Sequence, residues 1–212
     1  MGKLRARTEA EINQRYEDII NSARKLFLEM EYEDISLSII ANELNITRPS
    51  LYNYFDSKEA LFLELSKQEY LKLAEALSDG FQKQMDINDF CNHLYDVLMS
   101  DALFLKLMSL HQTVMETKVG REEMESFKRS TLPFFKALEK TIEIEFPKAD
   151  AEKRTMFALQ VNVLINTVHA FIYTPADQQE VMKALGVFGE APVPSAKEFY
   201  TNTLKSLAKA LI

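Results

Sequence analysis

Apolar residues recur at helical spacing, three, four or seven positions apart, along nearly the whole chain. No segment shows the strict alternation of a half-buried strand, and only five Gly and six Pro interrupt the pattern. The sequence therefore predicts an all-α fold. The long helices are expected over residues 12–30, 56–83, 86–100, 102–117, 121–146, 152–173 and 195–212.

Two short helices are predicted between residues 35 and 58. Ser36 can cap the first, whose apolar stripe ends at Leu44. Asn45 follows, and Asn tolerates the left-handed backbone at which helices commonly end. Thr47 can cap the second helix, with Pro49 in the first turn, where a missing amide costs nothing. The segment is thus predicted to form a helix, a tight turn and a second helix.

The second short helix combines an apolar inner side with a polar and aromatic outer side. Leu51 and Phe55 are four residues apart and should face inward. The remaining side chains belong to Arg48, Pro49, Ser50, Tyr52, Asn53 and Tyr54. A helix that enters a DNA major groove needs this mixture of phosphate donors and base-edge readers. The alternative is an ordinary solvated amphipathic helix.

The residue order from Ile40 to Leu61, I-A-x-x-L-x-I-T-R-P-S-L-Y-N-Y-F-x-S-K-E-A-L, resembles the N-terminal DNA-binding domain of the tetracycline-repressor (TetR) family of transcriptional regulators. The resemblance covers about residues 12–65, and many members carry Gly where Asn45 stands. It implies a three-helix helix-turn-helix domain over residues 1–56, with the start of a linking helix to about residue 65. A larger helical effector-binding and dimerisation domain would follow over residues 57–212.

The chemistry of the side chains and the resemblance together give a set of DNA-binding residues. Arg48 can pair with guanine O6 and N7, Asn53 is the second base reader, and Pro49 can touch a thymine methyl. The resemblance implies backbone contacts by Ser36, Thr47, Ser50, Tyr52, Tyr54 and Lys58. We expect Arg48→Ala to relax specificity at one base pair, and Tyr52→Phe to weaken binding to all sequences alike.

The linking helix is expected to start at a D-x-x-E capping box formed by Asp56 and Glu59 and to run to about Lys83. In the resembling family, a ligand in the second domain tilts this helix and spreads two DNA-reading heads. A homodimer bound to a double-stranded operator is therefore implied. By the same resemblance, its interface would be formed by residues 152–173 and 195–212.

Residues 152–173 are apolar nearly all round, which predicts a helix that is buried on most sides. Asn162, Asn166, His169 and Tyr173 form one polar stripe on it, which faces a ligand cavity, a second copy of the chain, or water. A small, mostly apolar effector is expected, because Met and aromatic residues lie beside a few polar groups. The candidate effector contacts are Phe104, Met108, His111, Met115, Thr131, Phe134, Leu138, Asn162, Asn166 and His169.

The charge of the chain is unusual for a DNA-binding protein. The formal net charge is −7, and residues 1–60 contain eight basic and eleven acidic residues. Binding must therefore depend on a few placed cations, such as an N-terminal arm of Lys3, Arg5 and Arg7, and should depend only weakly on salt. The single Cys91 fits a reducing cytoplasm, and neither terminus carries a signal peptide or an apolar run long enough to span a membrane.

No group of residues predicts an enzyme. The three histidines are scattered, Cys91 and His93 point apart on one helix, and no glycine-rich phosphate loop occurs. We therefore expect no cofactor, no metal and no catalysis. The alternative to a DNA-binding repressor is a helical small-molecule or partner-binding protein without a DNA function, which the negative charge and the Met- and Phe-rich second half would suit.

Overall fold

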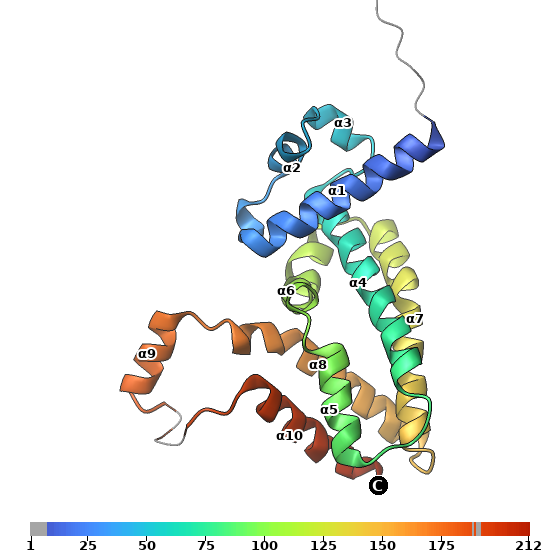
Figure 1. Cartoon of the computed structure of the whole chain (residues 1–212), viewed down its shortest axis with the longest axis vertical. Coiled ribbons are helices and arrows are strands. Elements are labelled where there is room, and N and C mark those ends of the chain that lie inside the picture. The colour runs from blue at the N-terminus through green and yellow to red at the C-terminus, as the bar shows by residue number, and fades with distance from the viewer. Residues whose placement is uncertain (1–7, 188, 190–191) are drawn as a thin grey trace, which may run out of the picture. The chain divides into compact units, whose positions relative to one another are not determined.

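Helices form all the regular secondary structure of the described residues, which confirms the all-α prediction. The computed structural model describes residues 8–187, 189 and 192–212, so the expected basic arm of Lys3, Arg5 and Arg7 lies outside the described residues. The α-helices are α1 (Glu9–Glu29), α2 (Leu37–Glu43), α3 (Arg48–Tyr52), α4 (Lys58–Gly80), α5 (Ile87–Leu98), α6 (Ala102–Leu110), α7 (Arg121–Glu145), α8 (Ala151–Ile172), α9 (Ala176–Ala184) and α10 (Ala196–Ala208) (Figure 1).

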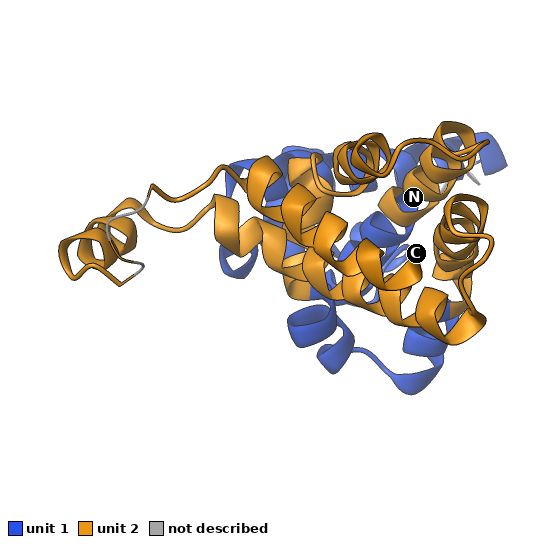
Figure 2. Ribbon diagram, turned by 90° about the horizontal axis from the view of Figure 1, so that it is seen from below, with its two compact units in different colours: residues 1–68, 111–128 blue, residues 69–110, 129–212 orange. Residues whose placement is uncertain are grey.

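The chain divides into two compact units (Figure 2). Unit 1 comprises Met1–Gln68 and His111–Lys128, and unit 2 comprises Glu69–Leu110 and Arg129–Ile212. The division falls within α4 and within α7, so each of these two helices contributes residues to both units.

Unit 1 is held together by apolar side chains from α1, α2, α3 and the first turns of α4. Ile19, Ile20 and Phe27 of α1 are fully buried. The Phe27 ring lies edge-on to the rings of Tyr32 and Phe62, at centroid distances of 6.2 and 5.1 Å. Because Phe62 belongs to α4, this aromatic cluster fixes α1 against the start of the long helix.

In unit 2, α8 packs on α6 and α10, and α10 also packs on α5. A row of edge-to-face aromatic contacts joins Phe90, Phe146 and Phe157, with centroids 5.4 and 6.1 Å apart. In contrast, α9 buries none of its side chains, and Figure 2 shows it apart from the other helices of this unit.

The expectation that residues 152–173 are buried on most sides is wrong for the single chain. Only one stripe of α8, at Phe157, Val161, Ile165 and Val168, is buried. Leu159 and Val163 are 57% and 61% exposed, and Met156 is also exposed. The residues of α8 are mostly apolar, as the sequence indicates, but the other helices of this chain cover only one side of α8.

Two further expectations about helix ends are corrected. Ser57, not Asp56, caps α4, because the Ser57 Oγ accepts a hydrogen bond from the Ala60 amide at 2.9 Å. The helix expected over residues 102–117 ends at Leu110 and continues as a π-helical turn, His111–Met115, and a 3-10 turn, Glu116–Lys118. Apolar spacing does not separate a π turn from an α-helix, because both keep nearly the same side of the helix facing inward.

Candidate nucleic-acid interface

The turn between α2 and α3 forms as the sequence predicts. Ser36 caps α2 by accepting a hydrogen bond from the Ile39 amide. Asn45 adopts a left-handed backbone with φ of 52°, and it is the only non-glycine residue in the described part of the chain with a positive φ. The Ile46 amide then donates to the Ala41 carbonyl at 2.9 Å, which closes the end of α2. The short turn therefore sets the direction in which α3 leaves.

α3 begins with a capped and ordered first turn. The Thr47 Oγ1 accepts a hydrogen bond from the Ser50 amide, and the hydroxyls of Thr47 and Ser50 lie 2.9 Å apart. Pro49 lies in the first turn, as predicted. Leu51 is fully buried and Phe55 nearly so, while the Tyr16 ring stacks on Phe55 at 5.3 Å. These apolar anchors hold the inner side of α3, which leaves its outer side to solvent.

Arg48 and Tyr52 form a pair on this outer side. The Arg48 Nη2 donates a hydrogen bond to the Tyr52 hydroxyl at 2.8 Å, and the Arg48 Cζ lies 5.4 Å from the centre of the Tyr52 ring. Both residues are exposed. The two side chains are one helical turn apart, a spacing that allows this contact, although the sequence alone predicts separate roles for them.

The other predicted DNA-binding residues of this segment fall into two groups by exposure. Ser36, Thr47, Pro49 and Asn53 are exposed, whereas Ser50 and Tyr54 are half-buried. The structure thus brings Thr47, Arg48, Pro49, Tyr52 and Asn53 together on one short helix and its caps, where all are accessible to a ligand. We call this set the α3 surface.

Lys58 is directed inward rather than toward the α3 surface. Its Nζ donates to the Tyr32 carbonyl oxygen at 2.8 Å and lies 3.9 Å from the centre of the Tyr32 ring. Burial, the largest effect, lowers the pKa of the Lys58 ammonium below its ordinary value. In this structure the Lys58 side chain is therefore used to join α4 to the 3-10 turn Tyr32–Asp34, and a phosphate contact would require it to turn outward.

Two more charged residues, Glu59 and Lys118, lie near Lys58. The sequence did not predict the contacts that they make. The Tyr32 hydroxyl donates to the Glu59 Oε1 at 3.3 Å, and the Lys118 Nζ lies 3.5 Å from the same oxygen. Burial and the Glu59 carboxylate raise the pKa of the Tyr32 hydroxyl. These partners lie 26 to 59 positions apart, so no local sequence signal could have revealed the group.

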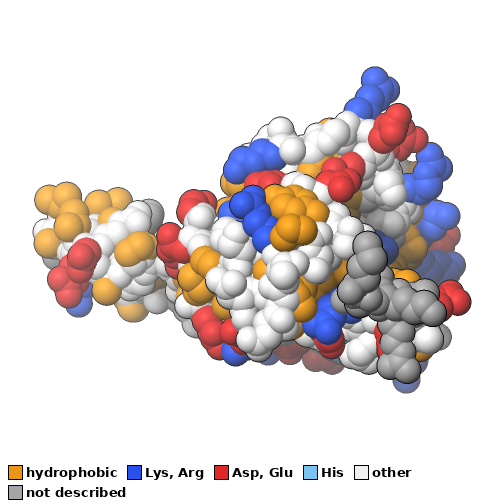
Figure 3. All heavy atoms as spheres, turned by 90° about the horizontal axis from the view of Figure 1, so that it is seen from above, with side chains coloured by type: hydrophobic (Ala, Val, Ile, Leu, Met, Phe, Trp, Pro, Cys, Tyr) orange, Lys and Arg blue, Asp and Glu red, His pale blue; other side chains and the backbone are white. Residues whose placement is uncertain are grey.

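Among the described residues on the face that Figure 3 shows, basic side chains do not form one continuous patch. Figure 3 shows Lys and Arg interspersed with Asp and Glu over the visible face. The acidic composition is thus visible on the surface as well, and Arg48 is the cation of the α3 surface itself. Any nucleic-acid contact must depend on a few placed groups more than on general attraction.

The predicted effector residues divide into a buried set and a half-exposed set. The buried side chains, all less than 3% exposed, are Phe104, Met108, His111, Met115, Thr131, Phe134 and Leu138. In unit 2, the Tyr70 ring contacts the rings of Phe104 and Phe134 at 5.6 and 5.0 Å. Asn162, Asn166 and His169 are half-exposed on α8. The apolar spacing identified buried positions correctly, but burial alone does not separate a ligand pocket from core packing.

His111 has charged neighbours that the sequence analysis missed. Its Nε2 lies 3.7 Å from the Glu116 Oε1, which also accepts a hydrogen bond from the Lys128 Nζ at 2.6 Å. His111 starts the π-helical turn, and π-helical turns are frequent at functional sites. The π-helical turn is the feature that points to these three side chains, and the sequence did not predict that turn.

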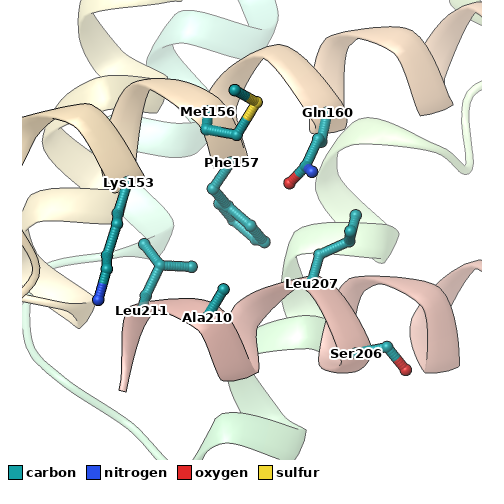
Figure 4. Close-up of a pocket in the computed structure, with 8 residues that line it drawn as sticks. All are labelled: Lys153, Met156, Phe157, Gln160, Ser206, Leu207, Ala210 and Leu211. Atoms are coloured by element: carbon teal, nitrogen blue, oxygen red, sulfur yellow. The ribbon is translucent and has the colours of Figure 1, made fainter.

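One hollow in unit 2 lies between α8 and α10 (Figure 4). It has a volume of about 200 Å³ and contains none of the predicted effector residues. In Figure 4, Phe157 points from α8 toward α10. The lining residues are Lys153, Met156, Phe157, Gln160, Ser206, Leu207, Ala210 and Leu211.

Comparison with known proteins gives matches over both parts of the chain. Residues 19–65 match the family described as bacterial regulatory proteins, tetR family, and residues 67–190 match the tetracyclin repressor-like C-terminal domain. The HTH-type transcriptional repressor AcnR of Corynebacterium diphtheriae is 26% identical over 73 residues, which are 34% of this chain and 38% of AcnR. The chain spans less than half the length of the curated relatives it matches.

Two solved structures share the fold over most of their length. A TetR/AcrR-family regulator from Thermobifida fusca has a TM-score of 0.58 at 17% identity, over 91% of this chain and 97% of that chain. The regulator FadR from Bacillus subtilis, solved in complex with stearoyl-CoA, has a TM-score of 0.57 at 14% identity, over 91% and 96%. At such low identity these likenesses establish a common fold alone.

Proposed function

Because the chain belongs to the tetracycline-repressor (TetR) family of bacterial transcriptional regulators, we propose that it binds a specific operator as a homodimer and represses transcription until a small effector releases it. The observation that carries the proposal is the α3 surface. A five-residue helix follows a left-handed turn and presents Arg48, Pro49, Tyr52 and Asn53 to solvent while Leu51 anchors it. This is the construction that places a recognition helix in a major groove.

The chemistry of the exposed groups supports a division of roles within this surface. Arg48 carries the donors for guanine O6 and N7, Asn53 for an adenine edge, and Pro49 offers an apolar contact to thymine. Thr47, Ser50, Tyr52, Tyr54 and Ser36 would position the DNA backbone, as the resemblance implies. Lys58 fits this role less well, because its ammonium group is bonded to the Tyr32 carbonyl.

The experiment that tests the function is selection of duplexes from a random pool, followed by titration of the selected duplex with wild-type and Arg48→Ala protein. We expect the variant to lose about 1–3 kcal/mol of binding free energy and to relax the preference at one base pair in each half-site. A wild-type protein that selects no sequence at low salt would instead favour the partner-binding alternative. Unchanged base preference in Arg48→Ala would refute the role of Arg48.

A dimer interface built from α8 and α10 is supported by the apolar side chains these helices leave uncovered. Met156, Leu159 and Val163 lie on one stripe of α8, and Phe199 of α10 is 41% exposed. The hollow between the two helices adds the half-buried Leu207 to this apolar area. Exposed apolar side chains on two adjacent helices are typical of a protein interface.

α8 also has the length and hydropathy of a membrane-crossing helix, because it has 22 residues and contains an 18-residue window with a mean hydropathy of 1.4. The interior of α8 carries the polar side chains of Asn162, Asn166 and His169, which are costly to place in a bilayer. One stripe of the helix is already packed on α6 and α10. We therefore assign the apolar surface of α8 to a second copy of the chain rather than to lipid.

The effector proposal draws on the aromatic cluster of unit 2. Tyr70, Phe104 and Phe134 are nearly fully buried and in ring contact, so an effector that entered there would have to displace packed rings. A mostly apolar compound suits this lining. Stearoyl-CoA, which is bound in the Bacillus subtilis FadR structure, is a suitable first compound. We expect it to raise the melting temperature and weaken DNA binding, and the absence of both effects would exclude this compound.

A further inference from the structure

The contact between Arg48 and Tyr52 bears on how Arg48 would recognise a base pair. We infer that Tyr52 is a positioning residue for base recognition: its hydroxyl holds the Arg48 guanidinium in one orientation and so sets the specificity of the base pair that Arg48 reads. The inference rests on the proposed function. Its basis is the 2.8 Å hydrogen bond from the Arg48 Nη2 to the Tyr52 hydroxyl, with the guanidinium carbon 5.4 Å from the ring centre.

The hydrogen bond leaves Arg48 able to read a base. A guanidinium has five N–H donors, and the bond to Tyr52 uses one of those on Nη2. The other N–H of Nη2 and those of the neighbouring nitrogens remain, which is enough for the two parallel hydrogen bonds to guanine O6 and N7. Tyr52 accepts in this pair, so its own O–H stays available to donate to a phosphate oxygen.

Fixing the guanidinium matters because Arg48 is an exposed side chain on a helix of only five residues. A free arginine side chain loses rotamer entropy when it binds, and it can also turn toward a wrong base or a phosphate. The bond to Tyr52 removes part of this freedom before DNA arrives. Discrimination at the contacted base pair should therefore depend on Tyr52 even though Tyr52 itself need not touch that base.

The test compares wild-type, Tyr52→Phe, Arg48→Ala and double-variant proteins on the selected duplex and on duplexes with each base pair of a half-site replaced. Tyr52→Phe keeps the ring and removes only the hydroxyl, and Tyr52 is 40% exposed, so the fold should persist. We expect Tyr52→Phe to reduce the preference at the Arg48 base pair about threefold to tenfold, beyond any uniform loss of affinity. The contact between the two side chains thus replaces the expectation from the sequence that Tyr52→Phe weakens binding to all sequences alike. In the double variant, the preference should be no lower than in Arg48→Ala alone.

The matched control is Tyr54→Phe, which removes a hydroxyl from the same segment but not from the Arg48 pair. It should change the affinity for all duplexes by a common factor. A Tyr52→Phe protein that keeps full preference at the Arg48 base pair, or relaxes a different one, overturns the inference while the function stands. A wild-type protein that selects no sequence overturns both, so the two failures can be told apart.

Discussion

Asn45 shows how a single residue fixes the path of the chain into the α3 surface. Its φ of 52° lies in the left-handed region, where a Cβ atom costs free energy and Asn is tolerated better than most residues. The turn requires this conformation, because it brings the Ile46 amide to the Ala41 carbonyl, to which the amide donates a hydrogen bond. Asn45 thus adopts, at some cost in free energy, a left-handed backbone conformation that glycine adopts without strain.

The turn predicts opposite effects for two substitutions. We expect Asn45→Gly to leave the free energy of unfolding unchanged or to raise it by up to about 1 kcal/mol, and Asn45→Ala to lower it by about 1 kcal/mol. Chemical denaturation of the purified variants measures both. Equal destabilisation by Gly and Ala would mean that the left-handed turn is not what limits this position.

The residues that could be predicted are those whose partners lie within a few positions. Ser36, Asn45 and Thr47 act on amides or dihedral angles of their own segment, so their roles were visible in the sequence. Lys58 was not predictable in this way, because its partner Tyr32 lies 26 positions away. The effector residues present the same difficulty, since helical spacing identifies a buried side chain but not what it contacts.

At the level of elements, α4 is the helix whose start matters most, because it follows the α3 surface directly. The D-x-x-E pattern at Asp56 predicted a capping box, yet the Glu59 carboxylate accepts from the Tyr32 hydroxyl and lies near Lys118. Ser57 therefore provides the cap, one residue later than predicted. The Glu59 carboxylate thus contacts residues outside α4 instead of completing the predicted capping box.

This assignment predicts that Ser57→Ala lowers the free energy of unfolding by about 1 kcal/mol, the usual cost of losing a helix cap. Asp56→Ala, at the exposed neighbouring position, is the control and should change stability by less than about 0.5 kcal/mol. Thermal and chemical denaturation give both values. If Asp56→Ala lowers the free energy of unfolding more than Ser57→Ala does, then Asp56 caps the helix, as the capping box predicted.

α8 illustrates the limit of predicting burial from composition. Its apolar residues extend around the helix, but only Phe157, Val161, Ile165 and Val168 are covered by the same chain. The sequence indicates that such a helix needs neighbours on several sides, and it cannot say whether these come from one chain or two. The exposed stripe is therefore the feature of the fold on which the proposed dimer depends.

At the level of the whole molecule, a net charge of −7 makes the proposed assembly important for DNA binding. One α3 surface offers few cationic contacts, so a single protomer should bind DNA weakly. In a dimer, once one α3 surface has bound its half-site, the second α3 surface is held close to the other half-site. The second contact therefore forms at a high effective concentration. Sequence selectivity in this account thus depends on dimerisation.

A charged substitution on the uncovered stripe of α8 tests the dimer. We expect Leu159→Glu to yield monomers in sedimentation and to lose operator binding, because it places a carboxylate in an apolar interface. Leu28→Glu is the matched control, since Leu28 of α1 is 54% exposed, close to the 57% of Leu159, and lies in unit 1. A Leu159→Glu protein that remains dimeric would show that the interface lies elsewhere.

The most direct test of the central claim is the affinity of the wild-type protein for its selected duplex when the spacing of the two half-sites is changed. Two recognition helices related by a twofold axis read half-sites about one helical turn apart, roughly 34 Å. Inserting about five base pairs places the half-sites on opposite faces of the DNA and should reduce binding to that of a single half-site. Binding that is indifferent to both spacing and sequence would show that the protein does not read two half-sites as a homodimer.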